Sequence, residues 1–150
     1  MPMHRLTDTK VCTSLAPILA HVTADATGTG IPVGGYEEVL MVWQQGVSLD
    51  TLSGALYWSL TFEESDTLAT GYTTIATADL EGGVGTHLID AAAEDPTIIS
   101  RRYKGSKAYV RMLGTKTGTH TNGTPLAALV ICGKAVHTPV TQETELGTDT

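Results

Sequence analysis

The sequence predicts an all-β protein, a single-domain antiparallel β-sandwich of the jelly-roll-like kind. Three observations carry this prediction. Apolar residues recur with a period of two rather than in a long helical stripe. Sixteen glycines divide the chain of 150 residues into short segments. Charged residues make up only 17% of the chain, below the typical share of about 25%, so neutral threonine supplies much of the polar surface.

The clearest predicted strand covers residues 56–62. Its apolar residues alternate strictly with more polar ones, which places one aliphatic and aromatic face inward: Leu56, Trp58, Leu60 and Phe62. Residues 108–113 repeat the pattern, with Ala108, Val110 and Met112 on one face. Both segments are therefore expected to be half-buried strands.

Two further segments contain a continuous apolar run, residues 39–43 in the first and residues 126–132 in the second. Residues 37–43 follow the Gly34-Gly35 turn, and residues 126–132 run from Pro125 to Gly133. A continuous apolar run is typical of a strand that is covered on both faces or that lies in the centre of a sheet.

Weaker patterns complete the expected sandwich. The Asn122-Gly123 pair suits a hairpin turn, which would join a strand at 108–116 to the strand at 126–132. Residues 136–140 are expected to extend that strand past a bulge at Gly133. A single helical turn is expected at 91–94, and five shorter strands are expected at 11–15, 18–22, 73–77, 86–89 and 97–102.

The domain organisation is one β-sandwich body at residues 11–140 between two polar arms. Residues 1–10 and 141–150 are polar and are expected to be flexible arms. No signal peptide and no apolar span of about 20 residues is apparent, so we expect the protein to be made and kept in a cytoplasm, without contact to a membrane. Cys12 and Cys132 are expected to be free thiols, or to be bridged if the first and last strands are neighbours.

The formal net charge of −7 argues against nucleic-acid binding by the whole surface. One short basic cluster is an exception to the negative net charge: Arg101, Arg102, Lys104 and Lys107. It is interpreted as a solvated strand end and turn, with a local binding patch as the alternative.

No local motif for catalysis or metal binding is found. No two of the five histidines have the spacing of a local metal pair, although a cluster formed by the fold stays open: His4, His21, His87, His120 and His137. His120 lies in a turn and is expected to be exposed to solvent. His137 is expected at a strand end.

Three carboxylates follow the predicted strand at 56–62. Glu63 and Glu64 are adjacent on a strand, so they point to opposite faces and cannot share one small site. Asp66 could join Glu64 in a cation site, but a charged strand end is the favoured interpretation. We therefore expect no enzyme, and we assign no catalytic, cofactor-binding or metal-binding residue.

Aromatic residues are scarce, at 5% of the chain, and fall on predicted strands or their ends. Buried anchors of the core are the favoured interpretation. The alternative is a carbohydrate-binding β-sandwich that uses Trp43 and Trp58 as platforms for sugars.

Three segments, taken in order, resemble a family of small proteins encoded among the head genes of tailed phages and prophages. They are residues 35–42 (GYEEVLMV), residues 59–66 (SLTFEESD, followed by YTTI at 72–75) and residues 103–111 (YKGSKAYVR). The resemblance covers about residues 11–140 by pattern. One departure is that residues 67–71 replace the Asp-Gly turn that the family has after the second segment.

The resemblance implies a virion structural protein, most specifically a capsid decoration (cement) protein. Such a protein binds the outside of the shell, with the major capsid protein and further copies of itself, often as a homotrimer, as partners. Its location would be the capsid surface after synthesis in the host bacterial cytoplasm. A structural protein of the tail or of the head–tail neck is the alternative within the virion.

Overall fold

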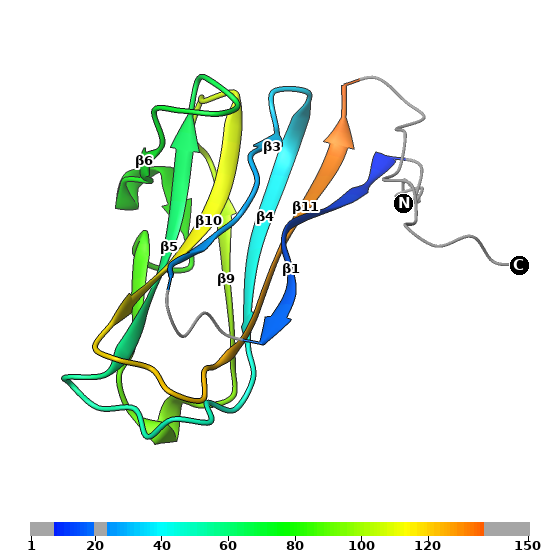
Figure 1. The fold of residues 1–150 in the computed structure, drawn as a ribbon. Helices are drawn as coiled ribbons and strands as arrows, with labels where there is room; N and C mark the ends of the chain where they lie inside the picture. Colours follow the sequence, from blue (N-terminus) through cyan, green and yellow to red (C-terminus); the bar gives the residue numbers. More distant parts are fainter. Residues whose placement is uncertain (1–7, 20–23, 137–150) are drawn as a thin grey trace, which may run out of the picture.

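The protein is a sandwich of two antiparallel β-sheets in a computed structural model that describes residues 8–19 and 24–136 (Figure 1). The first sheet has the strand order β1-β11-β4-β9-β7. Its strands are β1 (Lys10–Leu19), β4 (Tyr36–Gln45), β7 (Leu80–Glu81), β9 (Thr97–Tyr103) and β11 (Pro125–Ala135).

The second sheet has the order β2-β10-β5-β6, with β3 paired to β10 and β8 paired to β5. Its strands are β2 (Ala26–Thr27), β3 (Ile31–Pro32), β5 (Tyr57–Ser65), β6 (Thr73–Thr74), β8 (Thr86–Ile89) and β10 (Tyr109–Thr117). Two short 3₁₀ turns, η2 (Thr77–Asp79) and η3 (Ala92–Glu94), interrupt the described chain, where no helix is long enough to span a membrane.

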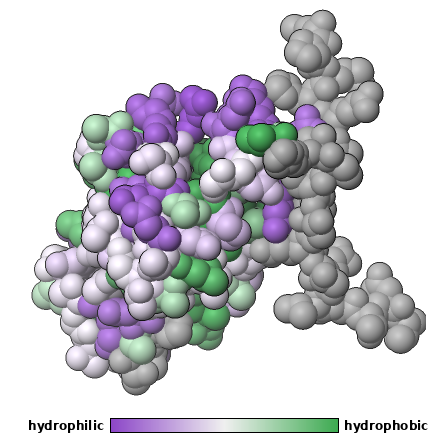
Figure 2. All heavy atoms as spheres, turned by 90° about the horizontal axis from the view of Figure 1, so that it is seen from above, coloured by the Kyte–Doolittle hydropathy of each residue, from purple (hydrophilic) through white to green (hydrophobic). Residues whose placement is uncertain are grey.

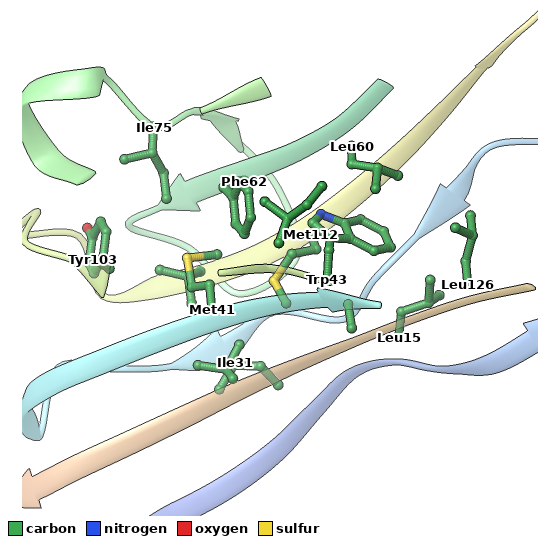
Figure 3. Packing of buried hydrophobic residues seen from close by; sticks show 14 of the residues in the cluster. Leu15, Ile31, Met41, Trp43, Leu60, Phe62, Ile75, Tyr103, Met112 and Leu126 are labelled. Atoms are coloured by element: carbon green, nitrogen blue, oxygen red, sulfur yellow. The ribbon is translucent and has the colours of Figure 1, made fainter. Parts of the chain in front are cut away.

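The core lies between the two sheets and is built by the inward positions of the long strands. Trp43 and Met41 of β4 point toward Leu60 and Phe62 of β5 (Figure 3). These four side chains are fully buried, and Met112 of β10 is buried with them. The alternation predicted at 56–62 and 108–113 is thereby confirmed: the residues of β5 and β10 that were predicted to face inward are buried.

The prediction of an all-β sandwich is confirmed, while the jelly-roll detail stays a prediction. β4 is central in its sheet, between β11 and β9, as its continuous apolar run indicates. The helical turn at 91–94 is present as η3. The strand predicted at 11–15 and residues 18–19 of the strand predicted at 18–22 belong to one strand, β1, with irregular register around Ser14 and Pro17; residues 20–22 lie outside the described residues.

The predicted hairpin at Asn122-Gly123 is wrong. β10 pairs with β5 and β11 pairs with β4, so residues 118–124 cross from one sheet to the other. Gly123 does have the positive φ of 86° that such a turn favours. The Asn-Gly pattern therefore reports the local backbone correctly, but it does not specify which strands become partners.

β11 continues through Gly133 to Ala135, with Lys134 at a positive φ of 50°. The expected extension at 136–140 lies beyond the described residues except for Val136. The same is true of residues 1–7 of the N-terminal arm and of the whole C-terminal arm at 141–150.

Candidate functional site

The three segments that carry the resemblance meet at one end of the sandwich. Val39 of β4 lies opposite Tyr103 at the end of β9. The Tyr103 hydroxyl donates a hydrogen bond of 2.6 Å to Glu64 Oε2 and accepts one of 2.9 Å from the backbone N–H of Lys107. Each segment thus contacts another through the ring of Tyr103 or the strand that bears it.

The environment of Tyr103 favours a neutral phenol. Burial raises the pKa of this hydroxyl, and the adjacent carboxylate of Glu64 raises it further. The phenol can therefore act as a hydrogen-bond donor to Glu64, but it is not poised to ionise. This pair fastens β9 to β5 across the sandwich.

The other two carboxylates that follow the predicted strand at 56–62, Glu63 and Asp66, bind other partners. Glu63 is on the outer face of β5, where its Oε2 accepts a hydrogen bond of 2.7 Å from Arg111 Nε on the neighbouring strand. The Arg111 guanidinium lies 4.0 Å from the centroid of the Tyr72 ring. Asp66 pairs with Lys107 at 2.6 Å.

The opposite orientation of Glu63 and Glu64 agrees with the sequence-based expectation. The suggested cation site of Glu64 and Asp66 is not assembled, because each carboxylate binds a different partner. Across residues 8–19 and 24–136, no group of three histidine, cysteine or acidic side chains is arranged to hold a metal ion.

Two neighbouring carboxylates offset part of the positive charge of the basic cluster. Arg102 and Lys104 both pair with Glu81, at 3.1 and 3.6 Å, and Lys107 pairs with Asp66. Arg101 lies 5.7 Å from the centroid of the Phe62 ring. Ion pairs of this kind reduce the positive potential available to a phosphate, which favours the interpretation as a solvated strand end. Figure 2 shows hydrophilic residues mainly along the upper rim of this end of the molecule, with neutral and hydrophobic residues over much of the remaining described surface.

The expectation that His120 is exposed is wrong. Its side chain is fully buried, with the ring centroid 5.0 Å from that of Trp58 and Nδ1 3.6 Å from Asp50 Oδ2. The turn crosses between the sheets, so it folds over the end of the core instead of projecting into solvent. His87 lies on β8, and His4, His21 and His137 fall outside the described residues.

Asp50 holds the crossing segment in place. Its carboxylate accepts hydrogen bonds from the backbone N–H groups of Thr121, Asn122 and Gly123. Burial opposes ionisation of Asp50, but these three donors and the nearby His120 outweigh it, so its pKa lies below the ordinary value.

A second set of buried polar groups lies beside this turn. Trp58 Nε1 donates to Thr124 Oγ1 at 3.0 Å, and that hydroxyl is 2.8 Å from Ser48 Oγ. Asp95 binds the backbone N–H of Ser48 and the side-chain amide of Gln45. In the described part of the chain neither ring nitrogen of His120 has a hydrogen-bond partner. No serine or threonine hydroxyl is therefore placed against this imidazole for activation.

The sequence did not predict the polar cluster at this end of the molecule, because its residues come from three separate loops.

The two tryptophans test the alternative of a carbohydrate-binding surface. Trp43 and Trp58 are both fully buried, as expected for core anchors. A sugar needs an exposed ring to stack on, so these two residues are not platforms for carbohydrate.

Cys12 and Cys132 lie on neighbouring strands, β1 and β11, are both buried, and form no disulfide within the described chain. Burial raises the pKa of Cys132 to about 12, with a smaller contribution from Cys12. The thiol is therefore protonated near neutral pH and is a poor nucleophile.

The outer faces of the two sheets differ in character. On the second sheet, the outward positions of β5 and β10 are mostly hydroxyl, tyrosine or charged side chains: Tyr57, Ser59, Thr61, Glu63, Tyr109, Arg111, Thr115 and Thr117. On the first sheet aliphatic side chains alternate along the cross-strand rows with polar ones: Thr13, Glu38, Gln44, Ser100 and Arg102. We call the aliphatic set the apolar face: Val11, Leu40, Val42, Ile98, Ala127, Leu129 and Ile131.

Comparisons with known proteins found no match to any family model, curated protein or solved structure.

Proposed function

We propose that this chain is a structural protein of a tailed-phage virion, a capsid decoration protein that binds the outer shell and stabilises it without catalysis. Its partners are the major capsid protein and further copies of itself. The observation that carries the proposal is the ordered set of three segments at 35–42, 59–66 and 103–111, which resembles head proteins of such phages.

The contacts within these segments support a mechanical role. Glu64, Tyr103 and Lys107 hold β5, β9 and the loop before β10 together through two hydrogen bonds. The residues that give the resemblance therefore serve to fasten the body rather than to form a reaction centre. A protein that braces a shell needs a rigid body, and these cross-strand bonds supply rigidity.

The distribution of charge also supports this role. A formal net charge of −7 keeps a protein of high copy number soluble and away from the phage genome before assembly. The four residues of the basic cluster lie in ion pairs or against an aromatic ring, and the apolar face offers a surface for contact with protein.

A binding assay with purified components tests the proposal. Capsids of the phage whose genome carries this gene, produced without the protein, are mixed with the full chain and sedimented. We expect saturable binding at a fixed ratio to the major capsid protein. Binding that is confined to tails, or no binding to either part, would refute the decoration role.

A further inference from the structure

The crossing segment, residues 118–124, carries the single asparagine of the chain. Asn122 is followed directly by Gly123, and no aspartate of the chain precedes a glycine. The segment joins β10 to β11 at one end of the sandwich (Figure 1). Asn122 is exposed, whereas Gly123 is buried. An asparagine before a glycine loses its side-chain amide more readily than other asparagines, because glycine has no Cβ to hinder attack by its backbone nitrogen.

This loss, deamidation, proceeds through a cyclic imide. The backbone nitrogen of Gly123 gives up its proton to water or hydroxide and attacks Cγ of Asn122. As the new N–Cγ bond forms, the Cγ–Nδ2 bond breaks and Nδ2 leaves with a proton as ammonia. Water then opens the imide at either carbonyl, which leaves aspartate or isoaspartate at position 122. The reaction consumes only water, so it needs no enzyme and no cofactor.

In the folded chain Asp50 restrains both partners of this reaction. The Gly123 N–H donates to Asp50 Oδ2 at 2.8 Å, so removal of its proton would set a negative nitrogen against a carboxylate. Asn122 Nδ2 donates to Asp50 Oδ1 at 3.2 Å and to the Leu49 carbonyl at 3.3 Å. These two bonds oppose the rotation that would bring Cγ against the Gly123 nitrogen. The Asp50 side chain is only 7% exposed, so water competes little for its oxygens.

We propose that Asn122 is a site of spontaneous deamidation that Asp50 holds closed, and that loss of the amide releases the crossing segment. The reaction therefore waits for a local opening that separates residues 121–123 from Asp50. The inference goes beyond the proposed function and does not depend on a place in the virion.

The product does not fit the site that the amide leaves. A carboxylate at position 122 has no N–H for the Leu49 carbonyl, and it places a second negative charge beside Asp50. The crossing segment also holds His120 against the Trp58 ring, and Thr124 Oγ1 accepts from Trp58 Nε1 at 3.0 Å. A change at an exposed residue is thereby transmitted to the end of the core.

The rate of deamidation tests the gate. The full chain is kept in mildly alkaline buffer with and without urea, and peptide mass spectrometry measures conversion at position 122. Conversion should be at least about tenfold slower in the folded chain, because it waits for local opening. Asp50→Ala should remove most of this protection in a chain that circular dichroism shows to be folded. If Asp50→Ala does not fold, Asp50→Ser takes its place.

Two controls separate local opening from general loss of stability. Tyr103→Phe removes a hydrogen bond far from the crossing segment and should leave the rate in the folded chain unchanged. Asn122→Gln should give no product, because its longer side chain cannot close the same ring.

Two further variants test the release of the segment. Asn122→Asp and Asn122→Ser both lose the Nδ2 donor, but only the first adds a charge beside Asp50. Asn122→Asp should therefore unfold at a lower urea concentration than Asn122→Ser.

Four results would overturn the inference: equal rates with and without urea, an unchanged rate in folded Asp50 variants, equal acceleration by Tyr103→Phe, or equal urea midpoints for Asn122→Asp and Asn122→Ser. None of these measurements involves the capsid, so failure of this inference and failure of the proposed function can be told apart.

Discussion

Each end of the sandwich holds a buried carboxylate that accepts hydrogen bonds from specific donors. At one end Glu64 accepts a hydrogen bond from Tyr103, and at the other Asp50 accepts three backbone N–H groups. A buried carboxylate that loses its donors keeps the cost of desolvation, which is why such pairs dominate the effect of single substitutions.

Tyr103→Phe removes the donor to Glu64 and leaves the carboxylate without this bond. We expect a loss of about 1–3 kcal/mol in the free energy of unfolding, measured by urea denaturation. In a Glu64→Gln background the same substitution should cost less, because a neutral amide loses less than a charged group. An equal cost in both backgrounds would show that the two side chains are not coupled.

Asp50 makes a pH-dependent contribution to stability. Its pKa in the folded protein lies below the ordinary 3.8, so the folded state binds a proton less readily than the unfolded state. The stabilisation is fully present above pH 3.8 and is lost as the pH falls through the lower, folded-state pKa.

Asp50→Asn provides the comparison for this effect, since it cannot titrate. The free energy of unfolding of the original chain should exceed that of Asp50→Asn near neutral pH, and the difference should shrink below pH 3.8. Urea denaturation over a pH series measures this difference. A constant difference throughout the acid range would contradict the role given to the carboxylate.

Single residues were the hardest level to predict from the sequence. The opposite orientation of Glu63 and Glu64 followed from the period of a strand alone. The burial of His120 did not, because it depends on residues 118–124 crossing between sheets and on Asp50, which lies far away in the sequence. Local turn composition contains no information about either.

Strands are the level at which sequence and structure agree best. Hydrophobic alternation gives the face of each residue directly, so β5 and β10 were predicted with the correct inward positions. The pairing of the strands was not predicted correctly. The segment at 118–124 was expected to close a hairpin, but β10 and β11 belong to different sheets. Alternation indicates which face of a strand is buried, but it does not indicate which strand pairs with it.

Adjacent residues of β10 allow a matched test of its orientation. Met112 is fully buried, whereas Leu113 on the other face is only partly buried. We expect Met112→Ala to lower the free energy of unfolding by about 2–5 kcal/mol, and Leu113→Ala to cost about 1 kcal/mol or less. Chemical denaturation of both variants would contradict the orientation if the two costs were similar or reversed.

The whole molecule joins two sheets of unlike character around one core. Inward residues from both sheets make the core, while one outer face is polar and the other bears the apolar face. The continuous runs at 39–43 and 126–132 indicated in advance that two strands were unusually apolar. The sequence did not show that these two strands are neighbours. Because β4 and β11 pair, their outward residues form one continuous surface.

The buried thiols report on the integrity of the whole fold. Cys12 and Cys132 lie inside the body on paired strands, and the pKa of Cys132 is about 12. We expect both to react with a thiol reagent only when the sheet opens, and the labelling rate to follow the unfolding equilibrium as urea is added. Rapid labelling of the native protein without urea would show that β1 is not held as described.

Cryo-electron microscopy of the phage particle whose genome encodes this chain tests the central claim most directly. We predict density for the β-sandwich at regular positions on the outer surface of the head, in copy number that follows the symmetry of the shell. Density for the sandwich in the tail or the neck alone, or a particle without this protein, would contradict the claim.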